Sequence, residues 1–579
     1  MSTEPSADQE IETESRADTI ARWTAALSDI PNVGKRLGPV TERQAALPAV
    51  VEARARADTR SGDRVCAFAE LDRMSDRIAA SLRAGGVPAG ARMVLAVPPG
   101  IDFVTLVFAL LKARLIAVLI DPGMGRENLL QCLADVEPDG FIGPPRVQAI
   151  RTLLRRRFPK ARFHVTCGRR YFWGGWTLDS LRRDDRSSLP DEPCSLDDPA
   201  AIIFTTGSTG PPKGVFYRHR QFARQVEEIQ SQYELLPGSC DVAAFPLFGL
   251  FNALMGSTTI FPEMDYTRPA DVEPSRIIDA VRRWNATRSF GSPAFWNRIA
   301  TYCDEHDVDL KPLQTVYSAG APVPVHVLER VLPRLEENGN LFTPYGATEA
   351  LPVASIGARE VLSETARATR AGKGTCVGRR FPGIAWKVIE ISDEPMATID
   401  QVKEVPVGTI GELMVSGDVV TERYVTREEA NALHKVADGD RTWHRMGDVG
   451  YLDDDDRFWF CGRKAHRVET AGGTMFTIPC EAVIASHSAI YRAALVGVGR
   501  PPRQRPVMIA EPWPDHWPDS ESAERELLEE LESLARAHPF PHPIERFFLM
   551  QRLPTDIRHN AKIFREQLAR WAEEQIGRP

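Results

Sequence analysis

The sequence lacks the marks of several large protein classes. Its nine cysteines form no CxxC pair and their number is odd, which argues against a disulfide framework and against a cysteine-based zinc site. The formal net charge is −8, so the composition does not favour nucleic acid, whose binding domains are usually basic, or a general attraction to anionic membranes. No internal repeat is evident.

The sequence pattern predicts neither a signal peptide nor a membrane span. Residues 1–18 are acidic and polar, so we expect a disordered tail and a cytoplasmic protein with reduced thiols. The most apolar stretch, 93–120, is interrupted by prolines and charges. It predicts a strand at 93–97, a helix at 102–113 and a strand at 115–120 in a buried core rather than a transmembrane segment.

A chain of 579 residues is too long for one hydrophobic core, so at least two domains are expected. Up to about residue 350, short β-branched strands alternate with helical segments, which indicates parallel sheets covered by helices. The region 378–460 changes to strands joined by turns, typical of antiparallel structure. Its four aspartates, 453–456, fit a solvated hairpin turn better than a metal site.

A strand that runs into a hydroxyl- and glycine-rich loop, 202–214, is the most informative segment. Glycines let a phosphate chain approach the backbone, successive N–H groups form an anion nest, and hydroxyls and a lysine add donors and positive charge. The lysine precedes a glycine, so this is not a Walker-type P-loop. The residues predicted to bind phosphate are Thr205, Thr206, Gly207, Ser208, Thr209, Gly210 and Lys213.

A basic run, 151–170, is centred on three consecutive arginines, 155–157. We interpret it as a solvated helix end before a strand at 162–166. The alternative is a docking surface for an acidic partner.

Further motifs follow the glycine-rich loop in order. They are Tyr345-Gly346-Ala347-Thr348-Glu349, Gly447-Asp448 with Gly450-Tyr451, Gly462-Arg463-Lys464, and Pro554 with Asn560-Ala561-Lys562. Together with the loop they resemble the adenylate-forming enzymes, the family of acyl-CoA synthetases, firefly luciferase and peptide-synthetase adenylation domains. The resemblance spans residues 45–570. It implies an α/β fold with a large N-terminal domain (19–461) of two α/β sheets plus a small β-barrel, and a small, mobile α+β C-terminal domain (462–579).

This resemblance also implies the chemistry, which is activation of a carboxylate by ATP with Mg²⁺. Both reactants are anions, so the barrier is largely electrostatic and positional. The implied catalytic residues are Lys562, which would bridge the carboxylate and the α-phosphate, Thr348, and Glu349, which would bind magnesium. The implied nucleotide contacts come from Ser318, Gly320, Ala321, Pro322, Tyr345, Gly346, Asp448 and Arg463.

Three positions depart from the pattern of that family. Ala465 stands where a hinge aspartate is expected, Glu469 where a lysine is expected, and Gly249 where a histidine is frequent. A negative Glu469 is an unusual lining for a channel that admits anionic coenzyme A. These departures, with residues 121–129 and 461–470, resemble the olefin-pathway β-lactone synthetases.

The closer resemblance implies a long-chain β-hydroxy (2-alkyl-3-hydroxy) acid, which is adenylated and then closed to a β-lactone by its own β-hydroxyl. It also implies an assembly with a reductase and a β-lactone decarboxylase. Alkyl chains require an apolar pocket, for which the candidates are Phe245, Leu247, Phe248, Gly249, Phe251 and Met255.

Several alternatives stay open at the level of sequence. His219, His444 and His466 are each available as a base for the β-hydroxyl. The competing functions are a long- or medium-chain acyl-CoA ligase, an acyl-AMP ligase that feeds a carrier protein, and a non-catalytic acyl- or nucleotide-binding module.

Overall fold

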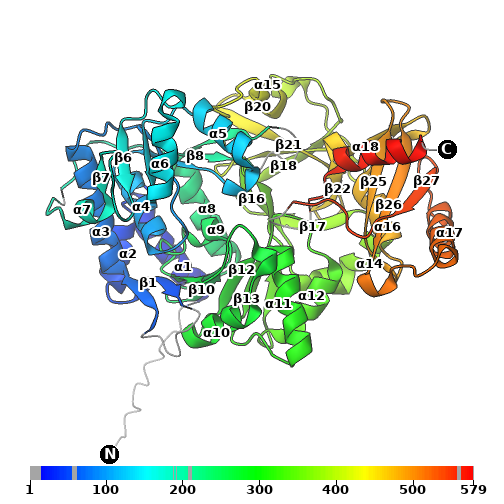
Figure 1. The fold of residues 1–579 in the computed structure, drawn as a ribbon, viewed down its shortest axis with the longest axis horizontal. Helices are drawn as coiled ribbons and strands as arrows, with labels where there is room; N and C mark the ends of the chain where they lie inside the picture. Colours follow the sequence, from blue (N-terminus) through cyan, green and yellow to red (C-terminus); the bar gives the residue numbers. More distant parts are fainter. Residues whose placement is uncertain are drawn as a thin grey trace, which may run out of the picture.

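The computed structural model describes residues 15–54, 62–186, 188–190, 192–205, 211–556 and 562–577. Five sheets organise them: two mixed seven-stranded sheets, one eight-stranded antiparallel sheet, and two small sheets of two and three strands (Figure 1). The predicted α/β class, with two α/β sheets and a small C-terminal part, is confirmed.

One seven-stranded sheet has the order β7-β6-β5-β3-β4-β8-β9 and is parallel except for the β8–β9 hairpin. Strands alternate with helices along the chain, as the sequence pattern predicts. The strands are β3 (Arg92–Leu95), β4 (Ile116–Leu119), β5 (Gly140–Gly143), β6 (Phe163–Thr166), β7 (Trp176–Thr177), β8 (Pro199–Phe204) and β9 (Gly214–Arg218). The helices are α3 (Phe68–Ala84), α4 (Ile101–Lys112), α5 (Arg126–Asp135), α6 (Pro145–Leu153), α7 (Leu178–Arg183) and α8 (His219–Gln232), preceded by α1 (Arg16–Ser28) and α2 (Leu37–Gln44).

Helix α4 explains the most apolar stretch of the sequence. It is buried on all sides in a core shared by the two seven-stranded sheets. Its last residue, Lys112, is also buried, and its ammonium pairs with Asp72 at 2.5 Å and Asp76 at 2.8 Å. Among the described residues, no helix combines the length and apolar character that crossing a bilayer requires.

The second seven-stranded sheet has the order β14-β13-β12-β10-β11-β1-β2. Its neighbouring strands are parallel except for the antiparallel pair β1–β2. The early strand β1 joins β11 in parallel, so the start of the chain completes a sheet whose other strands come much later. The strands are β1 (Pro48–Ala53), β2 (Arg64–Ala67), β10 (Cys240–Ala243), β11 (Thr258–Pro262), β12 (Arg288–Gly291), β13 (Thr315–Ser318) and β14 (Asn340–Phe342), and the helices are α9 (Pro246–Gly249), α10 (Pro274–Trp284), α11 (Pro293–His306) and α12 (Val325–Val331).

The eight-stranded sheet is antiparallel throughout, as predicted for the region after residue 378, although it already begins at residue 345. Its path is β15-β16-β17-β22-β21-β19-β18, and β20 pairs with β21. The strands are β15 (Tyr345–Ala347), β16 (Ala350–Ser355), β17 (Thr375–Arg380), β18 (Ala385–Ile389), β19 (Gly411–Ser416), β20 (Lys435–Asp438), β21 (Arg441–Leu452) and β22 (Arg457–Arg463), with short helices α13 (Ala358–Glu360), α14 (Ala366–Arg370) and α15 (Ala430–His434).

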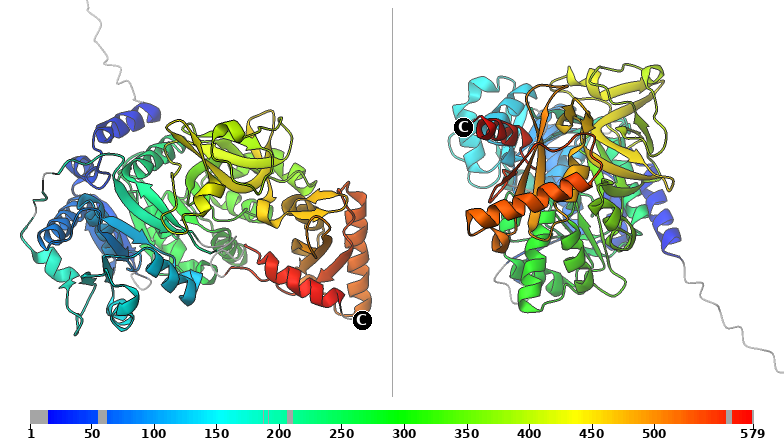
Figure 2. Two further views of the ribbon diagram at one scale, coloured as in Figure 1. Left: turned by 90° about the horizontal axis from the view of Figure 1, so that it is seen from above. Right: turned by 90° about the vertical axis from the view of Figure 1, so that its right-hand side faces the viewer.

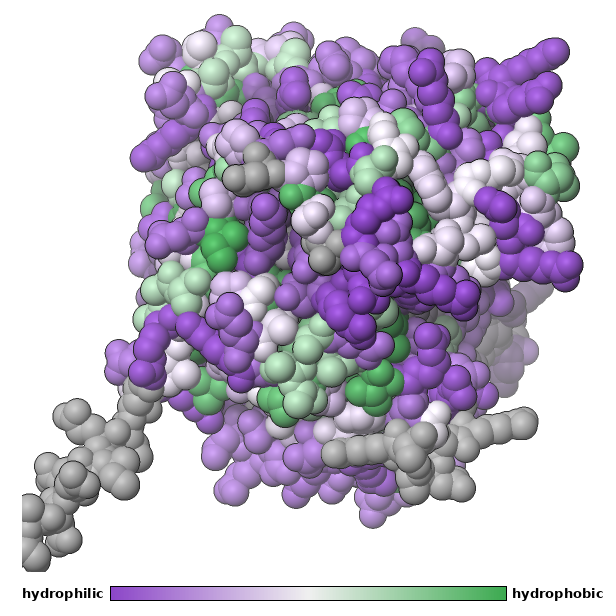
Figure 3. All heavy atoms as spheres, turned by 90° about the vertical axis from the view of Figure 1, so that its left-hand side faces the viewer, coloured by the Kyte–Doolittle hydropathy of each residue, from purple (hydrophilic) through white to green (hydrophobic). Residues whose placement is uncertain are grey.

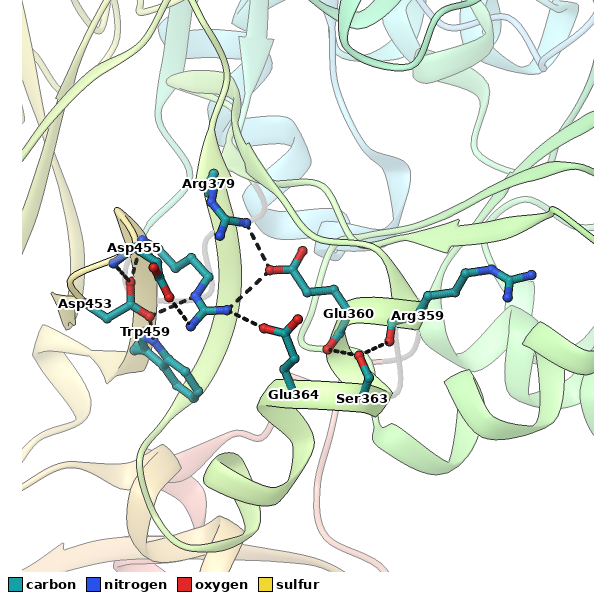
Figure 4. Close-up of polar contacts among 9 residues, drawn as sticks. Arg359, Glu360, Ser363, Glu364, Arg379, Asp453, Asp455 and Trp459 are labelled. Carbon is teal, nitrogen blue, oxygen red and sulfur yellow. Dashed lines mark hydrogen bonds and ion pairs between the residues drawn. The ribbon is translucent and has the colours of Figure 1, made fainter.

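The four aspartates form the turn between β21 and β22, as predicted, and Figure 4 shows Asp453 and Asp455 of this turn. Asp453 accepts hydrogen bonds from Trp459 Nε1 at 2.8 Å and from Arg457 Nε at 2.9 Å. The same guanidinium binds Asp455 and Glu364, each at 3.0 Å. Asp453 and Asp455 are therefore engaged by Arg457, and Asp453 also by the indole of Trp459.

The C-terminal part packs helices on both faces of a three-stranded sheet (Figure 2). Strand β25 is buried on both sides because Leu495 faces α16 and α17, whereas Ala494 and Val496 face α18. The strands of the C-terminal part are β23 (Val468–Thr470), β24 (Gly473–Met475), β25 (Ile490–Val498), β26 (Arg505–Pro512) and β27 (Arg546–Leu549), and its helices are α16 (Thr477–Ile484), α17 (Glu521–Ala537) and α18 (Arg565–Ile576).

The predicted N-terminal tail overlaps a helix. Helix α1 begins at Arg16, capped by the Ser15 side chain, so the predicted tail of 1–18 overlaps the helix by three residues; residues 1–14 lie outside the described residues. Strand β22 runs to Arg463, and the domain boundary at 461 stays a prediction.

A buried ion pair ties the antiparallel sheet to the segment that leaves it. Glu412 in β19 and Arg445 in β21 are at most 1% exposed, and their side chains meet at 2.6 Å. Lys464, the first residue after β22, reaches the same carboxylate oxygen at 3.0 Å. Removing one partner of such a group leaves charges buried without compensation.

We therefore predict that Glu412→Ala lowers the free energy of unfolding by roughly 3–5 kcal/mol. The matched control Glu390→Ala removes an exposed carboxylate 3.5 Å from Lys403 and should cost less than about 1 kcal/mol. Chemical denaturation of both variants measures the difference. Equal losses would contradict a special role for Glu412.

Candidate active site

A cavity of about 1980 Å³ runs through the molecule and brings the predicted motifs together. Its wall is formed by residues of both seven-stranded sheets, the antiparallel sheet and the C-terminal part. The predicted residues that line it are Thr205, Lys213, Ser318, Gly320, Ala321, Pro322, Tyr345, Gly346, Thr348, Glu349, Asp448, Arg463 and Lys562. The predicted residues Thr206, Gly207, Ser208, Thr209 and Gly210 lie outside the described residues.

The glycine-rich loop is closed at its base by two hydrogen bonds. The Thr205 N–H donates to the Lys213 carbonyl, and the Lys213 N–H donates to Thr205 Oγ1, both at 3.0 Å. Strands β8 and β9 continue this hairpin. The two ends of the loop are therefore held together beside the cavity.

Asp448 is held between an arginine and a tyrosine. Arg463 Nη1 lies 2.6 Å from its Oδ1, and the Tyr345 hydroxyl donates to its Oδ2. The facing carboxylate raises the pKa of Arg463, and burial followed by the same carboxylate raises the pKa of Tyr345. Gly447 has φ +66°, which a side chain would strain. The Gly-Asp motif thus reflects a backbone turn that presents one carboxylate.

Thr348 and Glu349 form the turn between β15 and β16. The Glu349 carbonyl accepts bonds from the Thr421 N–H at 2.9 Å and hydroxyl at 3.0 Å, and the Thr348 carbonyl accepts one from Tyr217 at 2.5 Å. The Glu349 carboxylate accepts a bond from the Tyr424 hydroxyl at 2.6 Å. Burial and this carboxylate raise the pKa of Tyr424, so the phenol stays a donor.

A cluster of basic side chains beside Glu349 was not predicted. Lys213 Nζ lies 3.4 Å from His434 Nε2 and 5.0 Å from the centre of the Tyr424 ring, and Lys435 lies over the same ring at 5.6 Å. Burial lowers the pKa of Lys435 to about 7 and, with Lys213, lowers the pKa of His434 to about 4. No sequence motif marks His434 or Lys435, because α15 and β20 come to lie beside the glycine-rich loop only in the folded protein.

Ser318 and Lys562 complete the wall of the cavity. Ser318 Oγ is buried and has no hydrogen-bond partner among the described residues, so a donor and acceptor faces the cavity at the end of β13. At the other side, the Lys562 N–H donates to Asp556 Oδ1 at 2.9 Å and the Asp556 N–H donates to the Lys562 carbonyl at 3.0 Å. The C-terminal part thereby holds the predicted lysine at the cavity.

The predicted apolar pocket is part of the same cavity. Phe245, Leu247, Phe251 and Met255 line it, whereas the Phe248 side chain lies outside the description. Gly249 does not line it, contrary to the prediction. A Cβ at this position would lie 2.8 Å from Ala243 Cβ and 2.9 Å from Thr259 Cγ2, so close packing accounts for the missing side chain.

The three candidate bases are in different places. His219 is fully buried, accepts a bond from the Val33 N–H at 3.2 Å and is not part of the cavity wall. His444 and His466 line the cavity. Burial lowers the pKa of His466 to about 4 and lowers that of His444 well below its usual value.

Ala465 and Glu469, two of the departures from the family pattern, make contacts with residues close to them. Glu469 pairs with Arg467 at 2.8 Å, and the backbone of Glu469 bonds both the backbone and the side chain of Gln504. Ala465 lies in a 3-10 turn, Lys464–His466. The carboxylate of Glu469 is thus neutralised by its neighbour.

Comparison with known proteins places these features in a family. The profile of the AMP-binding enzyme family matches residues 41–425. The chain belongs to the AMP-binding enzyme family. The resemblance to adenylate-forming enzymes is therefore confirmed, and so is the use of ATP to activate an acid.

The similar proteins are more specific. An olefin β-lactone synthetase of Xanthomonas campestris pv. campestris is 44% identical over 89% of this chain and 92% of its own length. One from Stenotrophomonas maltophilia is 42% identical over 88% and 91%. The structure of MenE, the O-succinylbenzoate coenzyme A synthetase of Bacillus subtilis, in complex with ATP and magnesium ion superimposes with a TM-score of 0.70 at 19% identity, covering 92% and 99%. The predicted similarity to the olefin-pathway β-lactone synthetases is thus confirmed.

The lowered pKa of His434 predicts an acid-sensitive site. Between pH 6.5 and 4 the unfolded state binds a proton that the folded state does not, so stability is lost as the pH falls through this window. We expect His434→Asn to reduce that loss by on the order of 2 kcal/mol, measured by denaturation at several pH values. The exposed His306→Asn is the control, and an unchanged pH profile for His434→Asn would contradict the prediction.

Proposed function

We propose that this protein is an ATP-dependent β-lactone synthetase that acts in the cytoplasm on a long-chain β-hydroxy acid. It would adenylate the carboxylate and then close the ring by attack of the substrate's own β-hydroxyl, releasing AMP. The observation that carries the proposal is the combination of 44% identity to an olefin β-lactone synthetase with a cavity in which apolar residues continue into the nucleotide motifs.

In the first step, the acid must approach an anionic α-phosphate. Lys213, Lys435 and Arg463 bring positive charge to this region, where low dielectric strengthens their attraction for phosphate oxygens. Lys562 would contact both the attacking carboxylate and the α-phosphate. Asp448 would accept the ribose hydroxyls, and its orientation is fixed by Arg463 and Tyr345.

The carboxylate of Glu349 is a suitable ligand for magnesium. One carboxylate oxygen is occupied by Tyr424, and Mg²⁺ usually takes one or two protein carboxylates together with substrate phosphates. A lone, nearly buried acidic side chain beside Lys213 matches that requirement. When bound there, the ion would neutralise polyphosphate charge and favour departure of pyrophosphate.

In the second step, the nucleophile is already part of the substrate. Holding the β-hydroxyl near the acyl carbonyl makes ring closure intramolecular, and the adenylate supplies a good leaving group that offsets ring strain. The neutralised Glu469 and the packed Gly249 are compatible with a reaction that admits no coenzyme A. The β-hydroxyl of the substrate requires reduction of a ketone, and the strained lactone requires a consuming enzyme. We therefore also propose a reductase upstream and a β-lactone decarboxylase downstream as partners.

The decisive experiment incubates the protein with ATP, magnesium and a long-chain β-hydroxy acid without coenzyme A. We expect a β-lactone and an equal amount of AMP, detected by proton NMR and chromatography. The long-chain acid without its β-hydroxyl is the control and should give no lactone. A thioester that forms only when coenzyme A is added would instead identify an acyl-CoA ligase.

A second test concerns Lys562. Lys562→Ala should lower ATP–pyrophosphate exchange by on the order of 10²–10³-fold, because it removes a positive charge aimed at developing negative charge. Lys403→Ala, which removes an exposed lysine, should leave the exchange rate unchanged. Exchange at the parent rate in the Lys562 variant would remove this residue from the adenylation step.

A further inference from the structure

The region around α6 is strongly basic, whereas the chain as a whole has a negative net charge. Residues 145–183 contain eleven arginines and lysines and one acidic residue, Asp179, whereas the whole chain has a net charge of −8. Arg155, Arg156 and Arg157 form a 3-10 turn directly after α6 and are all exposed. Within the described parts of the chain, these three side chains form no ion pair.

Large apolar side chains are exposed among these arginines. Leu153 is 84% exposed, Phe172 82%, Tyr171 53% and Ile150 52%. On α6 the spacing of Arg146, Ile150 and Leu153 puts them on one face of the helix. We call Arg146, Ile150, Leu153 and residues 155–157 the α6 face; Tyr171 and Phe172 belong to a neighbouring loop that begins beside the first residue of this helix.

The loop that carries Tyr171 and Phe172 starts beside α6. A Cβ on Gly168 would lie 4.0 Å from Pro145 at the start of this helix. The Phe172 and Trp173 rings pack edge to face at 5.1 Å, and the Arg169 guanidinium lies 5.3 Å from the centre of the Tyr171 ring. The aromatic side chains are therefore supported by their neighbours while staying open to solvent.

The cavity opens at this face. Arg146 and Ile150 are exposed and also line the cavity, as do Gly123 and Asn128 at the edge of α5. Between the two helices, Leu129, Leu130 and Val147 belong to one hydrophobic cluster. The residues that line the cavity thus extend from the α6 face to the site.

We propose that the α6 face binds the surface of an anionic phospholipid bilayer and lets an alkyl chain pass between the bilayer and the cavity. Arginines are attracted to anionic headgroups, and exposed aromatic and aliphatic side chains enter the headgroup region. An acidic protein would satisfy the arginines, but it gives no reason for a cavity mouth lined by an exposed isoleucine. The transfer of alkyl chains rests on the proposed function; the binding itself does not.

The surroundings agree with a local rather than a general membrane contact. Figure 3 shows the end of the molecule that carries β6, β7 and α7 in Figure 1, and its surface is mainly hydrophilic with separate hydrophobic patches. A bilayer would therefore be recognised by charge first and by a few inserted side chains second.

The test is co-sedimentation of the full chain with vesicles of phosphatidylcholine, with and without phosphatidylglycerol. We expect binding only to the anionic vesicles, and weaker binding as salt is added. Arg155→Gln with Arg156→Gln and Arg157→Gln should weaken binding on the order of a hundredfold. The matched control, Arg500→Gln with Arg503→Gln and Arg525→Gln, removes three other exposed arginines and should bind as the parent does.

A double variant, Leu153→Ser with Phe172→Ser, tests the apolar contribution and should reduce binding several-fold. No binding to anionic vesicles, equal loss in the control triple variant, or binding to polyglutamate but not to vesicles would overturn the proposal. Lactone formation from a long-chain β-hydroxy acid dispersed in detergent needs no vesicles. Its failure with intact vesicle binding would overturn the proposed function alone, and the reverse result would overturn only the bilayer contact.

Discussion

The buried carboxylate of Glu412 fixes the scaffold on which the site is built. Its Oε2 binds Arg445 in β21 and Lys464 at the exit of β22. Three residues after Arg445, β21 presents Asp448, and the residue before Lys464 is Arg463, which binds that aspartate. One buried group therefore determines both where the nucleotide motif lies and where the C-terminal part begins.

The site itself concentrates positive charge in a place where it is poorly solvated. Burial lowers the pKa values of Lys213 and Lys435, which shows that their charged forms are under-compensated by the protein. An anionic polyphosphate would supply the missing compensation.

Two of the departures from the family pattern, Gly249 and Glu469, have local explanations. Gly249 is explained by Ala243 and Thr259, which leave no room for a side chain. Glu469 is neutralised by Arg467 and needs no positive partner from a ligand. The two departures therefore have local physical causes, and both are consistent with a substrate that carries its own nucleophile.

Much of the fold could be predicted from the sequence because local patterns carried it. The strand–helix alternation gave the two α/β sheets, and the apolar run at 93–120 resolved into β3, α4 and β4. The tail predicted at 1–18 overlaps the start of α1, because the Ser15 side chain caps the helix by accepting a hydrogen bond from the Asp18 N–H and exact helix ends are hard to read from a sequence pattern.

The sequence by itself determined the chemical inventory: the glycine-rich loop, the carboxylates Glu349 and Asp448, and Lys562 in a fixed order. Only the tertiary structure decided how these groups meet. It brought His434 and Lys435 beside Lys213, excluded His219 from the cavity, and joined the cavity to the exposed face of α6. The reason is physical, since motifs record residues that act locally along the chain. Burial, shared partners and cavity shape arise from contacts between segments hundreds of residues apart.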